Sequence, residues 1–444
     1  MRTHSSLRDR LAPLALLPAL AACAAALAAA PAGALGVGVE STPVVPAENW
    51  EARSLLRDTI FAPVGDAARR RPGLIGQQTG APKVSFQPQT QEGSLYLVFA
   101  NERGRAYPLT GAGTYVIKRS LGDGSFQQVK VFLQDDPGCY LRLFPDGDRT
   151  LMDVYLFDLP FQRQIELPVA FESLLTSPLS RIMDLSRAAV DWPLVLAPQQ
   201  TEGDRRVADV AAAVRARLRG LRDMDDGAMD AAGKMVYIAT GSAAGKGGFN
   251  CSGFAKWVID GFYAPLAGHP MDITPLKARD AGIAKTWSAR YEELYDPYFG
   301  LDWSRGLAKS IAQERTGTMP TDEEVDVRDD TRVPYVRDVG YPVTSLKAVL
   351  YFLAREEPGM LYVGSVNAPS ALAVPDGIPT LRQHHHVIIL LPYFDQQGAF
   401  QVTVMERNVE TSIPSLVRRY GSEFVHLVHV ATDGPFQPPV LPAN

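Results

Sequence analysis

The sequence predicts an α+β protein in which an all-β accessory domain precedes a domain with helices and an antiparallel sheet. Three observations predict this class. The chain has 444 residues, more than one core usually holds, since domains run to about 100–200 residues. Residues 84–170 contain short apolar runs separated by turn residues, and helical periodicity begins near residue 171. Further strand-like runs follow toward the carboxyl end, so the second domain mixes both element types.

Residues 84–170 predict a β-sandwich-like domain. Turn sequences such as Gly122-Asp123-Gly124 and Pro145-Asp146-Gly147 lie between its apolar or alternating runs. Short strands separated in this way are typical of antiparallel sandwiches and barrels. The expected strands are Leu95–Phe99, Thr114–Lys118, Val129–Leu133, Tyr140–Phe144 and Leu151–Phe157.

Residues 171–444 predict the second, α+β domain. Apolar residues between Val207 and Leu221 recur at intervals of three and four, which indicates a helix with one buried face. A second helix is expected at Ser345–Arg355. The candidate sheet consists of four apolar runs, Leu361–Val366, Val387–Leu391, Phe400–Met405 and Phe424–Val430.

The amino end predicts an export signal. Three arginines within residues 2–10 precede the apolar stretch Leu11–Leu20, and small residues follow directly. Two cleavage sites fit this pattern. Leu20-Ala21-Ala22-Cys23 has the form of a bacterial lipobox, and Ala32-Gly33-Ala34 suits ordinary signal peptidase.

The choice between the two cleavage sites decides where the protein resides. We expect residues 1–34 to be a signal peptide and residues 35–83 to be a linker. If Cys23 carries lipid, the protein is tethered to the outer membrane; otherwise it is periplasmic or secreted. Export is therefore expected in either case.

Composition excludes several other classes. Apolar residues make up 46% and charged residues 21% of the chain, which disfavours a disordered chain or a multi-span membrane protein. The formal net charge is -5, and no basic run is longer than Arg69-Arg70-Arg71. A nucleic-acid-binding protein would carry a basic patch or stripe, so we expect no nucleic-acid partner.

Cys251 lies where a glycine-rich loop meets a predicted helix. Residues 247–258 read Gly-Gly-Phe-Asn-Cys-Ser-Gly-Phe-Ala-Lys-Trp-Val, and the apolar positions after the cysteine share its helical face. A thiol in a first helical turn sees free backbone N–H groups and the positive end of the helix dipole, which lower its pKa from about 8.5. The same N–H groups can hold an oxyanion. The alternative is an inert buried cysteine.

Apart from Cys23 the chain has only Cys139 besides Cys251, and we expect both to be free thiols.

A histidine-rich strand supplies the candidate base. Residues 383–391 read Gln-His-His-His-Val-Ile-Ile-Leu-Leu, and strict alternation would place His384 and His386 on one face. The next predicted strand ends in Glu406-Arg407-Asn408, a carboxylate and an amide that can orient an imidazole. Nucleophile, base and orienting group are therefore all available.

The segment from Tyr237 to Tyr263 resembles the NlpC-type cell-wall peptidases. Their signature is a Tyr, a Gly-Gly loop and Asp-Cys-Ser-Gly at a helix start, and here Asn250 replaces the Asp. The later segment, with His386-Val387 and then Glu406-Arg407-Asn408, is similar to the related CHAP amidases. The Pro358-Gly359 turn also matches both groups. The resemblance covers roughly 80 of the 444 residues, and Cys-Ser-Gly is its specific part.

The resemblance implies a papain-like cysteine peptidase or amidase that acts on peptidoglycan peptides or other peptides. The chain between Cys251 and His386 is longer than a minimal catalytic domain needs, so an insertion is expected around residues 264–342. The implied catalytic residues are Cys251 as nucleophile, His386 as general base and acid, Glu406 as orienting group and Asn408 as support. Candidate groups for substrate or oxyanion binding are Tyr237, Asn250, Ser252 and His384.

Three other interpretations remain at this stage. His384, His386 and Glu406 would also make a plausible zinc ligand set. We expect no metal and no cofactor, since no further motif of zinc-ligand spacing is present. A non-catalytic envelope protein could retain the fold for binding. A transglutaminase-type enzyme would use the same nucleophile but transfer the acyl group to an amine.

Overall fold

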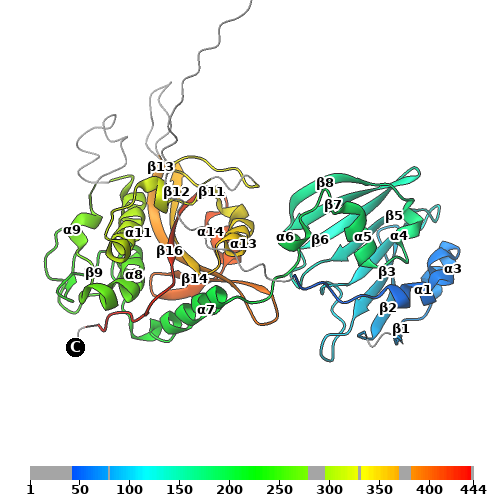
Figure 1. Cartoon of the computed structure of the whole chain (residues 1–444), viewed down its shortest axis with the longest axis horizontal. Helices are drawn as coiled ribbons and strands as arrows, with labels where there is room; N and C mark the ends of the chain where they lie inside the picture. The colour runs from blue at the N-terminus through cyan, green and yellow to red at the C-terminus, as the bar shows by residue number, and fades with distance from the viewer. Residues whose placement is uncertain (1–42, 79–80, 279–295, 329–331, 370–381, 442–444) are drawn as a thin grey trace, which may run out of the picture. The chain divides into compact units, whose positions relative to one another are not determined.

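The computed structural model describes residues 43–78, 81–278, 296–328, 332–369 and 382–441. By their contacts these residues belong to one compact unit, which contains two large antiparallel sheets and a two-stranded one (Figure 1). The α+β class is therefore confirmed. The predicted signal peptide, including Cys23, lies outside the described residues.

The first sheet is an eight-stranded meander in which each strand pairs with the next along the chain. The five strands expected in this region are confirmed as β3 to β7. Alternate side chains such as Leu97, Ile117 and Val129 are fully buried, because one face of the pleat is covered. The strands are β1 (Gly73–Ile75), β2 (Val84–Gln91), β3 (Ser94–Asn101), β4 (Tyr115–Ser120), β5 (Phe126–Phe132), β6 (Tyr140–Asp146), β7 (Arg149–Leu156) and β8 (Leu159–Leu167).

Short helices that precede and follow the eight strands along the chain pack into the same core as the first sheet. Ala52 and Ile60 on one side and Phe171 and Trp192 on the other belong to the same buried cluster as the strands. The structure thus differs from the expected linker at 35–83 and from the boundary at residue 170. Apolar periodicity indicates that a helix is buried but not which sheet it covers. The helices are α1 (Trp50–Leu55), α2 (Arg57–Phe61), α3 (Val64–Arg69), α4 (Phe171–Leu174), α5 (Leu179–Ser186) and α6 (Trp192–Val195).

The second large sheet has six strands in the order β11-β16-β12-β13-β14-β15, all antiparallel. The four strands expected near the carboxyl end are confirmed within β12, β13, β14 and β16. The strands are β11 (Tyr341–Pro342), β12 (Met360–Pro369), β13 (Arg382–Phe394), β14 (Phe400–Glu406), β15 (Val409–Thr411) and β16 (Phe424–Ala431).

Helices cover both faces of this sheet (Figure 1). On one face, α7 (Glu202–Arg215), α8 (Cys251–Ala267) and α11 (Phe299–Thr316) pack against Val387 and Ile389 of β13. On the other face, α13 (Leu346–Glu356) and α14 (Ile413–Tyr420) pack against Ile388 and Leu390. β13 is therefore apolar on both sides, which explains why residues 387–391 form a continuous apolar run.

The range expected to be an insertion contributes to this core. Trp303 and Leu307 of α11 are fully buried with α8 and the sheet. The shorter elements around it are β9 (Ala228–Met229), β10 (Met235–Val236), α9 (Ile273–Leu276) and α12 (Asp322–Val325). The described part of residues 264–342 thus contributes buried side chains to the core around the six-stranded sheet.

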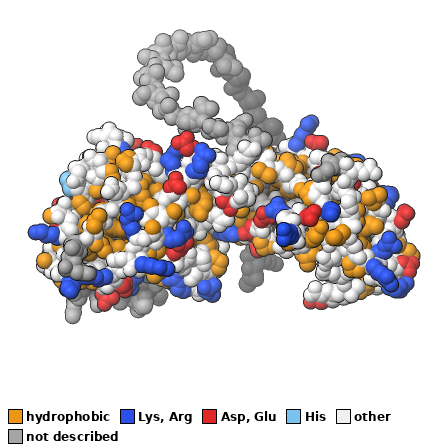
Figure 2. All heavy atoms as spheres, turned by 90° about the horizontal axis from the view of Figure 1, so that it is seen from below, with side chains coloured by type: hydrophobic (Ala, Val, Ile, Leu, Met, Phe, Trp, Pro, Cys, Tyr) orange, Lys and Arg blue, Asp and Glu red, His pale blue; other side chains and the backbone are white. Residues whose placement is uncertain are grey.

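The surface carries charges of both signs. Figure 2 shows Lys and Arg side chains interspersed with Asp and Glu across the face in view. No helix among the described residues is both long enough and apolar enough to cross a bilayer.

Candidate active site

Helix α8 begins at Cys251, as predicted. The side chain of Asn250 caps the helix, because its Oδ1 accepts a hydrogen bond of 2.8 Å from the backbone N–H of Gly253. Gly253 and Phe254 direct their N–H groups to Asn250. The N–H groups of Cys251 and Ser252 precede them, at positions where a helix lacks internal acceptors. Asn250 is therefore the N-cap, and the first turn supplies N–H groups beside the thiol.

The glycine of the Cys-Ser-Gly motif permits close packing of α8. A Cβ at Gly253 would lie 1.9 Å from the carbonyl oxygen of Gly227, just before β9. The same carbonyl accepts a hydrogen bond from the N–H of Asn250 at 3.3 Å. Ser252 is buried, and its carbonyl accepts from the indole of Trp303 at 2.9 Å. The start of α8 is thus fixed by β9 and α11.

β13 continues beyond the last residue pair that it forms with β14, and this part of β13 meets the start of α8. The pairing between the two strands ends at Ile389 and Met405, so residues 382–388 extend beyond it. The side chain of His386 and the backbone of Val387, both in β13, lower the pKa of the Cys251 thiol. Helix and strand therefore meet at the thiol.

His386 lies between the thiol and Glu406. Its Nε2 is 2.8 Å from Oε2 of Glu406, which leaves Nδ1 as the ring nitrogen available to Cys251. Both side chains are buried, with His386 9% and Glu406 3% exposed. The structure thus brings the three predicted residues together, with His386 hydrogen-bonded to Glu406 and acting on the pKa of Cys251.

The electrostatics favour a thiolate and an imidazolium. Burial acts to raise the pKa of Cys251, but the hydrogen bonds and charge of His386 outweigh it and lower that pKa. Burial acts to lower the pKa of His386, but Cys251 and Glu406 raise it to about 9. Cys139 is the contrast, because burial beneath the first sheet raises its pKa. Both cysteines are free, as expected, and Cys251 alone has an activating partner.

Arg419, which was not among the predicted site residues, binds the carboxylate from α14. Its Nη2 contacts Oε1 of Glu406, and its Nη1 donates to Oε2 at 3.2 Å. Burial acts to raise the pKa of Glu406, but His386 and Arg419 lower it. Beside Arg419, the ring of Tyr420 lies 5.8 Å from that of His386. The sequence Arg418-Arg419-Tyr420 has no motif that marks either residue as part of a site.

His384 does not join His386. Its Nδ1 is 2.9 Å from Oγ of Ser365, and its ring lies 6.0 Å from that of Tyr298. The prediction of a shared face is wrong because β13 has an irregular register opposite Val366 and Asn367, which breaks the alternation. Burial lowers the pKa of His384 well below 6.5. Nowhere in the described residues do three or more His, Cys, Asp or Glu side chains form a group that could hold a metal ion.

Asn408 and Tyr237 are placed outside the Cys251-His386-Glu406 group. Asn408 occupies the left-handed region (φ 70°) in the turn between β14 and β15, and its Nδ2 donates to the carbonyl of Arg222 at 2.8 Å. Tyr237 follows β10, and its side chain is 39% exposed. Within the described ranges, neither side chain is hydrogen-bonded to Cys251 or Glu406.

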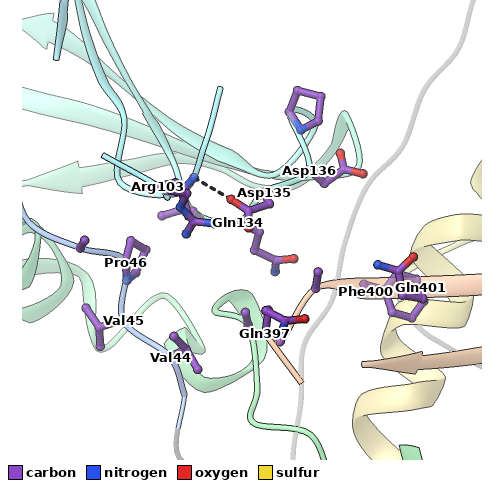
Figure 3. A pocket seen from close by; sticks show the side chains of 17 residues that line it. Val44, Val45, Pro46, Arg103, Gln134, Asp135, Asp136, Gln397, Phe400 and Gln401 are labelled. Atoms are coloured by element: carbon purple, nitrogen blue, oxygen red, sulfur yellow. Dashed lines mark hydrogen bonds and ion pairs between the residues drawn. The ribbon is translucent and has the colours of Figure 1, made fainter. Parts of the chain in front are cut away.

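A cavity of about 500 Å³ opens beside His386. It lies between the β14–β15 turn and the last turn of α14, and its lining residues are His386, Glu406, Arg407, Val409, Glu410, Thr411, Arg419 and Tyr420. A second cavity, of about 530 Å³, involves none of these residues. Figure 3 shows its lining, with Val44, Arg103, Asp135 and Gln397 among the labelled side chains. The cavity beside His386 therefore borders two titratable groups of the site, although Cys251 is not among its lining residues.

Fold and site together define an α+β protein with a Cys-His-Glu chain at a helix start. A family model described as a domain of unknown function (DUF8515) matches residues 44–194. That range corresponds to the first sheet with α1 to α6, and it ends before Cys251. Comparisons with curated proteins and with solved structures found no match.

Proposed function

We propose that this protein is an exported cysteine hydrolase that cleaves amide bonds. The second sheet and its helices would be a papain-like catalytic part, and the first sheet an accessory part. The observation that carries the proposal is the buried hydrogen bond between His386 and Glu406 beside Cys251, together with a lowered thiol pKa and a raised imidazole pKa. A nucleophile beside a base that is itself held by an orienting group is typical of covalent catalysis.

Acylation begins with the Cys251 thiolate. It attacks the carbonyl carbon of the amide, so that a C–S bond forms and the carbonyl electrons move to oxygen. The N–H groups of the first turn of α8 lie where they can donate to this oxyanion. The His386 imidazolium then gives its proton to the amide nitrogen, the C–N bond breaks, and an amine leaves.

Deacylation uses the same residues in the reverse order. Neutral His386 takes a proton from water, whose oxygen attacks the thioester carbon. The C–S bond breaks, the acid product leaves, and the thiolate and imidazolium are restored. Glu406 keeps the imidazole in the tautomer that presents Nδ1 to sulfur, because its carboxylate accepts the Nε2 proton.

Peptidoglycan peptides are the proposed substrate. The support is the resemblance of the Cys251 and His386 segments to wall-directed peptidases, together with the export signal at residues 1–34. The cavity beside His386 is lined by Arg407 and Arg419 as well as Glu406 and Glu410, so it would offer charged groups of both signs to a part of the peptide that extends past His386.

The first test concerns the thiol. The mature protein would be treated with limiting iodoacetamide across a pH series, and the modified cysteine located by mass spectrometry. Cys251 should react selectively with an apparent pKa below the ordinary value of about 8.5, and His386→Ala should raise that pKa. Buried Cys139 serves as the internal control and should stay unmodified. Failure of Cys251 to react, or indifference to His386, would remove the basis of the proposal.

The second test concerns the reaction. Purified peptidoglycan fragments would be incubated with the wild type and with Cys251→Ala, and newly formed amino groups quantified by mass spectrometry. New amines and acids from the wild type alone support hydrolysis. Incorporation of an added primary amine would instead show acyl transfer. Binding without any product would indicate a non-catalytic envelope protein.

A further inference from the structure

Arg419 lies on the side of Glu406 opposite His386. It belongs to the last turn of α14, whose side chains Ile413 and Leu416 are buried against the second sheet. The helix is capped by Ser412, which accepts a hydrogen bond from Ser415 N–H. Arg419 is thus presented from a packed element, although its own side chain is 42% exposed.

Arg419 binds the carboxylate through two nitrogens. One contacts Oε1 of Glu406 and the other donates to Oε2, the same oxygen that is bound to His386. A planar guanidinium that meets a carboxylate in this way fixes both its position and its rotation. An ammonium would supply charge but not this orientation.

Glu406 depends on this support because it is almost completely buried. A carboxylate that is 3% exposed has little access to water that could replace missing donors, and burial alone favours its neutral form. Asn408, the residue expected to assist, instead binds the carbonyl of Arg222. Among the described residues, Arg419 is the positively charged side chain, other than His386, that contacts the Glu406 carboxylate.

We infer that Arg419 is a positioning residue, which holds Glu406 so that its Oε2 remains on Nε2 of His386. This inference rests on the proposed function, since Arg419 would keep Glu406, and through it His386, in position beside Cys251. Arg419 itself does not reach the reacting atoms in this role. Its effect would pass through the carboxylate to the imidazole.

Charge and orientation make opposite predictions for the pKa of His386. The titratable and charged groups around the imidazole are Cys251 of α8, Glu406 of β14, and Arg419 and Tyr420 of α14. If Arg419 acted only as a positive charge, its removal would raise the pKa of His386. If it positions Glu406, its removal frees the carboxylate to turn away, and the pKa of His386 falls.

The experiment measures this pKa directly by NMR titration of the labelled imidazoles, with His386→Ala to assign the signal. The variants are R419Q and R419K, and R418Q at the exposed neighbouring position is the matched control. In the wild type the pKa should be near 9. Both Arg419 variants should lower it by about one pH unit or more, and R418Q should leave it unchanged.

The outcomes separate the inference from the proposed function. A wild-type pKa near 6.5 would refute the activated pair itself. A raised wild-type pKa that stays the same or increases in R419Q, with thermal unfolding showing a folded variant, would refute only the positioning role. If the pKa of His386 in R419K equals that of the wild type, a positive charge at position 419 is sufficient and the guanidinium geometry is not required. A loss of stability without a pKa change would assign Arg419 to the packing of α14.

Discussion

Substitution of Gly253 by alanine tests whether the position of α8 controls the thiol. An added Cβ would lie 1.9 Å from the oxygen of Gly227, 2.9 Å from its carbonyl carbon and 3.1 Å from Cα of Ala228. These atoms are backbone, so no side chain can rotate away. Helix α8 would have to move by more than about 1 Å to reach an ordinary methyl–oxygen separation.

Two terms set the expected stability change. Alanine favours a helix over glycine by about 1 kcal/mol. Forcing an extra methyl into a packed site costs about 1–3 kcal/mol, and a backbone clash this close belongs at the upper end. The net loss is then about 2 kcal/mol, which lowers Tm by about 2–3 °C for one compact unit spanning Glu40–Asn444, because the entropy of unfolding grows with chain length.

Displacement of α8 should also weaken the reaction of Cys251. A shift of about 1 Å between reacting groups can reduce rates by about 10²-fold. Thermal unfolding followed by tryptophan fluorescence would measure stability, and iodoacetamide labelling at several pH values would measure the thiol pKa. Gly65→Ala is the control, because its Cβ would meet only the end of Arg69 at 3.5 Å. Wild-type Tm and thiol pKa in Gly253→Ala would refute the reasoning.

Two further predictions concern residues around the site. Lys256 and Asp260 form a fully buried ion pair of 2.6 Å within α8, so Lys256→Met should cost about 3–5 kcal/mol by leaving the carboxylate without its cation. The additional change Asp260→Leu should restore part of this loss in urea unfolding, but not all of it, because the N–H of Met271 then loses its acceptor. A stable single variant would contradict this. Asn408→Ala should lose about 1 kcal/mol through its bond to Arg222 while the pKa of Cys251 stays the same, and a shifted pKa would return Asn408 to the site.

Local patterns in the sequence were sufficient for most elements and for the choice of Cys251 as candidate nucleophile. Alternating runs with turn residues predicted β3 to β7, because a strand buried on one face repeats every two residues. The glycine-rich loop before Cys251 and the apolar positions at helical spacing after it predicted the start of α8. Cys251 and Glu406 became candidates because they lie at the start of α8 and the end of β14, and His386 because it directly precedes the apolar run at 387–391.

Tertiary structure alone decided the neighbours of these residues. The irregular register of β13 separates His384 from His386, and no periodicity reveals where two strands fall out of alternation. Arg419 reaches Glu406 only because α14 folds back over the end of β14. The helices at residues 50–69 cover the first sheet instead of forming a linker, because burial depends on which apolar face is nearest in space. A sequence pattern records that a face is buried, whereas the partner of that face depends on how distant segments pack.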